Sequence, residues 1–340
     1  MNPDTTRIKK RAALISLIIG FLMFFGKMGA YLLTGSAAVL SDALESIVHI
    51  IATSFAFYSL IVSTKPPDKE HPYGHGKISF FSAGFEGAMI IIASFSIIYY
   101  AVRDIIFGSN ISSLDIGAGI IIAASFINLI LGWYLVKTGR KTKSIVLIAD
   151  GKHVLTDSIT SFGAVAALVL VLITDINLFD PIIAIILALN ILWTGKDLVR
   201  ESIGGLMNEQ NKNIIEEIAG AVDKQRKLNP YWIDLHKLRY WKSGDRFIVD
   251  FHLTVPFFSS IEESHNEYDK LEHLLKEKLD TADLELLMHL DPCKLYFCKI
   301  CRQGECKFRS EEQKFDAIWD DKKVIEDATF VVGDVAAADP

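Results

Sequence analysis

Cysteine is scarce in this 340-residue chain and is absent from its apolar part. The four cysteines, Cys293, Cys298, Cys301 and Cys306, lie in one short polar segment near the C-terminus. A disulfide framework of the kind that staples small secreted domains therefore cannot hold the core. This scarcity excludes a disulfide scaffold as the class of protein.

A basic domain is also missing. Lys and Arg number 35 against 41 Asp and Glu, so the formal net charge is -6, and the chain contains no nucleic-acid recognition motif. Binding to nucleic acid therefore has no support. The HExxH motif of zinc proteases is absent too, which argues against a membrane metalloenzyme.

Apolar sequence is what the chain has in excess, with 51% hydrophobic residues and a mean hydropathy of +0.31. Six apolar segments are each long enough to cross about 30 Å of hydrocarbon at roughly 1.5 Å per helical residue. We expect helices at 12–34, 37–63, 78–106, 116–138, 144–173 and 180–199. The first follows a basic run, exceeds the length of a signal-peptide core and lacks a convincing cleavage site, so we expect it to be retained.

Basic residues mark alternate connections between these segments. Lys and Arg occur before the first segment, between the second and third, and between the fourth and fifth, but not in the other three connections. By the positive-inside rule both termini are predicted to lie in the cytoplasm. The predicted class is an integral protein of the cell (inner or plasma) membrane, with a six-helix transmembrane domain at 1–207.

After residue 207 the pattern changes to that of a soluble α+β module. At 208–292 we expect a helix near 214–222, strands at 233–240 and 246–254, an amphipathic helix at 262–279 and a third strand at 284–289. This order fits a small two-layer fold. A Cys-rich segment at 293–309 follows, and the acidic, alanine-rich tail at 310–340 is predicted to be disordered.

Two pairs of ionisable residues lie inside the apolar segments, each pair four residues apart. Glu45 and His49 are in the second segment, and His153 and Asp157 are in the fifth. Residues four apart share one helix face, and each charge at bilayer depth costs about 2.5–3.5 kcal/mol. Two carboxylates and two imidazoles can form a four-ligand site for a divalent transition metal. Interhelical hydrogen bonding without metal is the alternative.

Two further carboxylates lie close to these pairs in the sequence. Asp42 and Asp150 precede Glu45 and His153 by three residues. Each could be a ligand, a partner of a ligand or a helix-end residue. At this spacing Asp42 stays near the face of Glu45, so the choice of carboxylate remains open.

Three other groups of residues could bind metal. Asp68, His71 and His75 share a loop with Pro72, Gly74 and Gly76, which favour a tight turn that brings them together, although a polar loop with incidental histidines fits as well. The expected module carries His236, His252, His265, His289 and Asp291. From spacing alone those histidines are a weak signal. The Cys-x4-Cys-x2-Cys-x4-Cys segment suits zinc or an iron–sulfur centre, or consists of reduced thiols on a flexible tail.

Taken together, these features resemble the cation diffusion facilitator family of divalent-metal transporters. The resemblance covers about residues 10–295. Its markers are Gly35-Ser36, the paired ligands of the second and fifth segments, the His-Pro-Tyr-Gly-His-Gly-Lys loop at 71–77 and the His-Leu-Asp-Pro sequence at 289–292.

The resemblance implies a homodimer with six helices and a metallochaperone-like cytoplasmic domain per subunit, which exports a divalent metal in exchange for protons. Carried over by position, it implies a transport site at Glu45, His49, His153 and Asp157. It also implies a loop site at Asp68, His71 and His75, and a cytoplasmic binuclear site at His236, His252, His265, His289 and Asp291.

One departure concerns the second helix, where the family usually has Asp or His first and Asp second. Here the residues are Glu45 and His49. Two imidazoles with two carboxylates suit Zn²⁺ best and also Fe²⁺ or Co²⁺. The expected function is therefore metal/proton antiport without enzymatic activity. A membrane-anchored metal sensor is the alternative, but it leaves the intramembrane residues unexplained.

Overall fold

The computed structural model describes residues 3–34, 37–107, 116–174, 176, 178–244, 246–279, 281, 283–304 and 306–327. Within some helices it describes the backbone only, and the side chains of Asp42 and Glu45 are among those outside the description. The chain divides into two compact units, Met1–Met207 and Asn208–Pro340.

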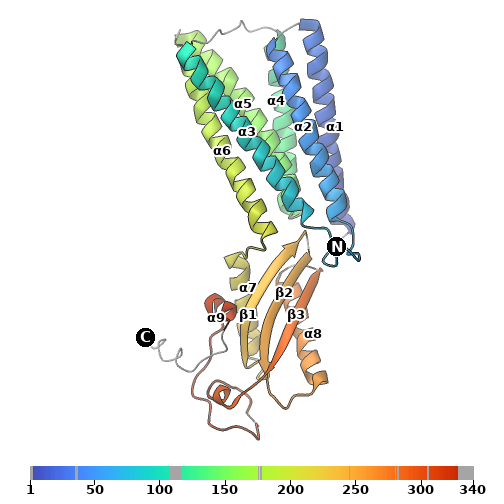
Figure 1. Ribbon diagram of the computed structural model, residues 1–340, viewed down its shortest axis with the longest axis vertical. Coiled ribbons are helices and arrows are strands. Elements are labelled where there is room, and N and C mark those ends of the chain that lie inside the picture. The colour runs from blue at the N-terminus through green and yellow to red at the C-terminus, as the bar shows by residue number, and fades with distance from the viewer. Residues whose placement is uncertain are drawn as a thin grey trace. The chain divides into compact units, whose positions relative to one another are not determined.

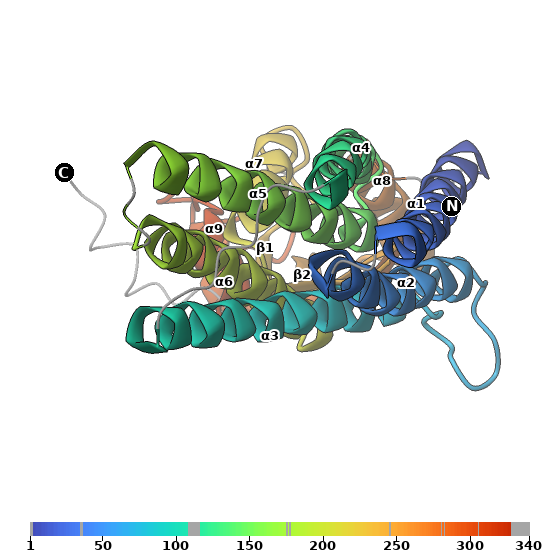
Figure 2. The same cartoon turned by 90° about the horizontal axis from the view of Figure 1, so that it is seen from above.

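The first unit is built from long helices. They are α1 (Pro3–Thr34), α2 (Ala37–Ser63), α3 (Ile78–Phe107), α4 (Ile116–Lys141), α5 (Ile145–Thr174) and α6 (Phe179–Leu206). Figure 1 shows them side by side, and Figure 2 shows the bundle in cross-section. Each predicted apolar segment forms one helix. Helices α1, α4 and α6 extend further than the apolar segments because charged residues continue them at their polar ends.

Length and composition suit these helices to a membrane. Among the described residues, four helical spans meet both conditions: Asp4–Gly29, Ile78–Phe107, Ile122–Lys141 and Pro181–Leu206. Helix α2 contributes a shorter apolar stretch, His49–Ser63. Large apolar side chains such as Phe25, Trp133 and Ile186 are more than half exposed on the outside of the bundle. These side chains suit a lipid environment and would be unfavourable in water.

Glycines allow two helix pairs to approach closely. A Cβ atom added at Gly87 of α3 would lie 3.0 Å from the carbonyl oxygen of Gly195 on α6. One added at Gly151 of α5 would lie 2.8 Å from the backbone nitrogen of Val136 on α4. In membranes, where helix association depends on close packing, small residues at such contacts are the usual solution. Gly151 thus lets α5, which carries His153, pack tightly against α4.

The second unit is an α+β domain with a three-stranded sheet. Its elements are α7 (Lys212–Arg226), β1 (Asp234–Ser243), β2 (Arg246–Val255), α8 (Ile261–Lys278), β3 (Leu284–Pro292), a 3₁₀ turn η1 (Leu295–Lys299) and α9 (Asp321–Ile325). The predicted order of helix, two strands, helix and strand is therefore confirmed. Strand β2 is central, antiparallel to β1 and parallel to β3. Helix α8 provides the crossover that parallel pairing requires.

The two faces of this sheet differ. Val249, Phe251 and Leu253 of β2 point into a core shared with α7 and α8. Because side chains alternate along a strand, His252 lies on the opposite face. A capping box at Ser260 and Glu263 fixes the start of α8, and thereby the connection from β2 to β3. The sheet thus keeps its helices on one face and presents its histidines on the other.

The prediction of a disordered tail from residue 310 is wrong for residues 311–327. Trp319 is 1% exposed and belongs to the same core as the sheet, together with Ala317 and Val324. The guanidinium of Arg226 stacks on the Trp319 ring at 5.1 Å and donates a hydrogen bond to the Ala317 carbonyl. Acidic residues dominate the composition of this segment, but a few apolar anchors and one buried arginine are sufficient to order it.

We expect Trp319→Ala to destabilise the separately produced unit 208–327 by about 3–5 kcal/mol, because it removes a fully buried indole and leaves a cavity. Denaturant unfolding followed by circular dichroism measures the change. Leu228→Ala, at a 76% exposed position, is the control and should unfold at nearly the wild-type midpoint. Equal stability of the Trp319 variant and the wild type would mean that the tail is dispensable to the core.

Candidate metal-binding sites

Helices α2 and α5 bring three predicted ligands together inside the first unit. His49, His153 and Asp157 each offer one ligand atom, and these atoms lie within 4.8 Å of one another. Nε2 of His153 is 3.8 Å from a carboxylate oxygen of Asp157, and the rings of His49 and His153 are 5.4 Å apart. Two imidazole nitrogens and a carboxylate oxygen are ligands that Zn²⁺, Fe²⁺ and Co²⁺ accept.

Glu45, the fourth predicted ligand, lies on α2 one turn before His49, and its side chain is outside the described residues. The same holds for Asp42. Their roles therefore remain predictions.

Neighbouring polar groups orient both imidazoles. Nε2 of His49 is 3.4 Å from the hydroxyl of Thr53, and that hydroxyl donates to Asp150 at 3.2 Å. With a proton on Nε2, His49 keeps Nδ1 for a metal, and this atom is buried and has no hydrogen-bond partner among the described residues. His153 has the opposite arrangement, because its Nδ1 lies 3.2 Å from a carboxylate oxygen of Glu86 and Nε2 faces Asp157. Such partners fix the ring orientation of metal-binding histidines.

Asp150 therefore lies beside the candidate site and outside the close group of three. Its side chain is 1% exposed and reaches His49 through Thr53. Of the roles left open for Asp150, this position favours a partner that supports a ligand.

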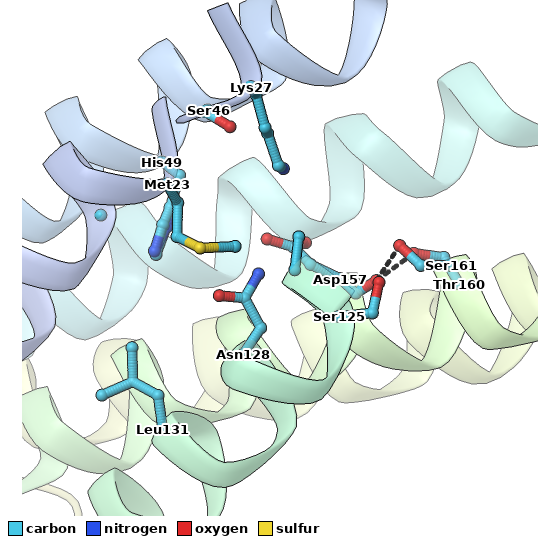
Figure 3. Close-up of a pocket in the computed structure, with 12 residues that line it drawn as sticks. Met23, Lys27, Ser46, His49, Ser125, Asn128, Leu131, Asp157, Thr160 and Ser161 are labelled. Atoms are coloured by element: carbon cyan, nitrogen blue, oxygen red, sulfur yellow. Dashed lines mark hydrogen bonds between the residues drawn. The ribbon is translucent and has the colours of Figure 1, made fainter. Parts of the chain in front are cut away.

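A small polar cavity of about 40 Å³ adjoins these residues (Figure 3). His49 and Asp157 line it together with Asn128 of α4 and Lys27 of α1. Figure 3 shows Lys27 and Asn128 directed into the same space as Asp157. The Lys27 ammonium is positively charged, as a transported metal ion would be. The side-chain amide oxygen of Asn128 can act as a further metal ligand.

Glu86 and Lys27 were missed by the sequence reasoning. Both lie within apolar helices and are at most 9% exposed. The cost of a charge at bilayer depth, which identified the paired residues, applies equally to a single residue. Neither residue has an acidic, basic or imidazole side chain four positions away, so the spacing that marks the paired residues does not mark Glu86 or Lys27.

We expect Glu86→Gln to slow metal transport about 10- to 100-fold, the usual cost of removing a partner that orients a metal-binding histidine. The amide keeps the size of the side chain but removes the charge beside Nδ1 of His153. Transport rates and metal affinity of the purified variants give the measurement. Glu201→Gln, at an exposed position on α6, is the matched control. Wild-type rates for Glu86→Gln would separate Glu86 from the site.

The loop between α2 and α3 brings its three predicted residues together. Asp68, His71 and His75 form a second close group. The carboxylate of Asp68 is 3.2 Å from a ring nitrogen of each histidine. The backbone N–H of His71 donates to Asp68 at 2.7 Å and holds the pKa of that carboxyl below its usual value. Gly74, with φ of +80°, completes the turn that folds His75 back.

The sheet aligns three histidines of the second unit in one row. His236 of β1 pairs with His252 of β2, and His252 pairs with His289 of β3. Asp291 lies two residues after His289 and therefore on the same face. One of its oxygens is 2.9 Å from Nδ1 of His252 and 3.5 Å from Nε2 of His236, and the other is 3.5 Å from Nε2 of His289. A bridging carboxylate among three imidazoles suits one or two divalent transition metals.

A second carboxylate positions His236. Asp234 is fully buried, and its carboxylate lies 3.2 Å from Nδ1 of His236 and 3.2 Å from the Lys323 ammonium. Burial alone would raise the pKa of Asp234, but hydrogen bonds from His236 and Lys323 outweigh it and hold this pKa below its usual value. Lys237 adopts φ of +54° beside His236, and its N–H donates to the Glu326 carbonyl. The C-terminal segment thus supports this site as well as the core.

His265, the fifth predicted ligand of this group, lies on α8. It is exposed, and its ring stacks on Tyr268 at 5.8 Å. Within one described chain, the close group contains His236, His252 and Asp291, with His289 adjoining through its ring contact with His252. The participation of His265 therefore stays a prediction.

We expect His289→Ala to weaken Zn²⁺ binding to the separately produced unit 208–327 by at least about tenfold, equivalent to about 1.4 kcal/mol. The imidazole lies beside Asp291 and His252, so its loss removes one nitrogen from the row. Calorimetry gives affinity and stoichiometry. His273→Ala, at an exposed position of α8, is the matched control. Unchanged binding by the His289 variant would remove this residue from the set.

The four cysteines follow directly after β3. They carry free thiols and line one cavity of about 310 Å³. Burial raises the pKa of the Cys301 thiol. Burial opposes deprotonation of Cys298 as well, but hydrogen bonds from Ser310 outweigh it and lower that pKa. Of the two interpretations left open, thiols on a flexible tail is the less favoured one, because Cys301 is part of the domain core.

Comparison with known proteins agrees with this organisation. Residues 13–207 match the family described as "Cation efflux transmembrane domain", and residues 209–293 match "Cation efflux protein, cytoplasmic domain". The fold and these two family matches define an integral membrane transporter of cations. The chain belongs to the cation efflux family, the cation diffusion facilitators that its sequence resembles, and members of this family are transporters and not enzymes.

Three relatives illustrate the range of the family. "Uncharacterized transporter sll1263" of Synechocystis is 32% identical over 288 residues, covering 85% of this chain and 92% of the relative. "Manganese efflux system protein MneP" of Bacillus subtilis is 25% identical over 303 residues, covering 86% and 99%. "Cation-efflux pump FieF" of Yersinia pestis is 25% identical over 300 residues, covering 87% and 96%. The similarity therefore spans both units.

Proposed function

We propose that this protein exports a divalent transition-metal ion, Zn²⁺ foremost and Fe²⁺ or Co²⁺ as alternatives, by exchange for protons. The observation that carries the proposal is the close group of His49, His153 and Asp157 beside a polar cavity in the membrane unit. Ionisable residues at membrane depth usually mark ion or proton pathways. The names of two relatives, a manganese efflux system protein and a cation-efflux pump, support export of a divalent ion.

Ligand chemistry supports zinc over manganese as the cargo. Imidazole suits Zn²⁺, Fe²⁺ and Co²⁺, whereas Mn²⁺ prefers carboxylate, carbonyl and water oxygens. The close group contains two imidazoles, His49 and His153, and one carboxylate, Asp157. With Glu45 as the fourth ligand, the set gains an oxygen and still keeps two nitrogens.

Proton exchange follows from competition at the imidazoles. Free imidazole has a pKa near ~6.5, so protons and metal compete for it around neutral pH. Metal bound at Nδ1 of His49 and Nε2 of His153 excludes protons from those atoms. Glu86 and Asp150 remain beside the outer atoms of the two rings and stabilise the positive charge that returns when the metal leaves. The helices rock to expose the group to the other side, where protons replace the metal.

The second unit is proposed to lie in the cytoplasm, with both chain termini, as the distribution of basic residues favours. We propose a homodimer in the cell membrane, in which the second units pair. Metal bound at the histidine row would favour one dimer geometry and so tune transport. The loop group at Asp68 would bind metal on the same side of the membrane.

Uptake into sealed proteoliposomes with an acidic interior tests the proposal, one metal at a time. Zn²⁺ should enter faster than into protein-free vesicles, and collapse of the pH gradient should slow its entry. A membrane-anchored sensor would bind Zn²⁺ through its second unit without moving it. Absence of flux for Zn²⁺, Fe²⁺ and Co²⁺, with binding retained, would favour the sensor.

A further inference from the structure

The four-cysteine segment is unexplained by transport and begins where the match to the family's cytoplasmic domain ends. We propose that Cys293, Cys298, Cys301 and Cys306 hold an iron–sulfur cluster. The proposal goes beyond metal export. It uses the proposed cytoplasmic location only to explain why the thiols remain reduced.

The cavity is the first observation. All four cysteines line it, and its volume of about 310 Å³ far exceeds the space that a single bound water needs, roughly 10–15 Å³. The remaining lining is mainly apolar, with Ile233, Phe257, Leu295, Phe297 and Phe308. The rings of Phe257 and Phe308 meet at 4.9 Å and shield one side. Four thiols around a largely apolar cavity fit a polynuclear centre.

The separation of the thiols is the second observation. A Cys₄ zinc site has Zn–S bonds of about 2.3 Å, which places the sulfur atoms about 3.8 Å apart in a tetrahedron. The described part of the chain contains three groups of at least three potential ligand atoms within 4.8 Å of one another, and none includes a cysteine. In an iron–sulfur cluster no iron atom binds more than two of the four thiolates, so three of the sulfur atoms need not lie within that distance of one another. The geometry favours a cluster over a single zinc ion.

The polar contacts of the segment are the third observation. The guanidinium of Arg309 donates to the carbonyls of Cys298, Cys301 and Gln303, which fixes the loop that carries the thiols. Arg309 also lines the cavity, where its charge offsets that of a thiolate-bound cluster. The backbone N–H of Ser310 donates to the sulfur of Cys298 at 3.5 Å. Hydrogen bonds to sulfur are one way in which proteins set the potential of such clusters.

The spacing agrees with these contacts. Cys293, Cys298 and Cys301 follow the Cys-x4-Cys-x2-Cys order of plant-type ferredoxins, with Cys306 as the fourth ligand. The N–H of Cys293 donates to Val255 and continues the β2–β3 ladder, so the first ligand sits on a rigid element. The site is thus built partly by the sheet and partly by the loop that Arg309 fixes.

The full-length protein, purified under nitrogen in detergent and treated with Fe³⁺, sulfide and a thiol reductant, tests the proposal. We expect iron and acid-labile sulfide in equal amounts, two or four of each per chain, with visible sulfide-to-iron charge-transfer absorption. Mössbauer spectra separate the two cluster sizes. Zinc bound by the thiols in place of iron and sulfide, or iron without sulfide, would overturn the assignment.

Variants locate the cluster. Cys298→Ala and Cys306→Ala, both at partly exposed positions, should lose all sulfide and the visible absorption while keeping the wild-type circular dichroism. The double variant His252→Ala/His289→Ala controls for iron at the histidine row and should keep both signals. A cluster that survives both cysteine variants would overturn the proposal, as would its loss from the histidine variant alone.

Discussion

Asp157→Ala is expected to reduce metal transport to the rate of protein-free vesicles. Asp157 supplies the carboxylate of the close group, 3.8 Å from Nε2 of His153, and lines the adjoining cavity. No described neighbour in that group can replace its charge, so the metal would face two neutral imidazoles in a low-dielectric surrounding. Initial rates for Zn²⁺, Fe²⁺ and Co²⁺ in proteoliposomes provide the measurement.

The control for this variant is Asp197→Ala, which removes a carboxylate at an exposed position of α6. It should transport at the wild-type rate. Size-exclusion chromatography of both variants in detergent verifies that the assembly stays intact. If Asp157→Ala vesicles move all three metals as fast as the wild type, the assignment of the transport site to α2 and α5 is wrong.

His49→Asp is expected to change which metal is transported. It replaces an imidazole nitrogen by a carboxylate oxygen, so the preference should shift from Zn²⁺ toward harder ions such as Mn²⁺. The variant should also depend less on pH. Wild-type transport should rise between about pH 6 and 7 as imidazole loses its proton, whereas a free Asp has already lost its proton near ~3.9.

Initial rates for several metals across that pH range, in both proteins, test this expectation. Asn128→Asp is an informative comparison because it adds a carboxylate to the same cavity without removing His49. It should add oxygen ligands yet keep the pH dependence. Identical selectivity and identical pH profiles for His49→Asp and the wild type would make His49 a packing residue, and Asp42 would become the better candidate for a ligand.

The sequence predicted most of the fold because its elements are marked locally. Six apolar segments correspond to six helices, and the helix–strand order of the second unit follows from periodicity. His153 and Asp157 were predictable as a pair because spacing of four residues on one helix defines a shared face. Asp68, His71 and His75 were predictable as a group because one short loop holds all three.

Contacts between distant segments were beyond the reach of the sequence. The row of His236, His252 and His289 depends on strand register, which the α8 crossover and the parallel β2–β3 pairing set. Trp319 packs in the core although its neighbours in the sequence are acidic, because burial of one indole outweighs the average composition of the segment. Glu86 of α3 contacts His153 of α5, and no local sequence pattern predicts that these two residues meet.

Simultaneous recording of metal and proton movement tests whether this protein exchanges metal ions for protons. Proteoliposomes holding a zinc indicator and a pH indicator receive external Zn²⁺, with equal starting pH on both sides and the voltage clamped by an ionophore. If metal is exchanged for protons, Zn²⁺ entry raises the internal pH, both signals share one time course, and Asp157→Ala shows neither. Zn²⁺ entry by the wild type without any change of internal pH would contradict exchange for protons.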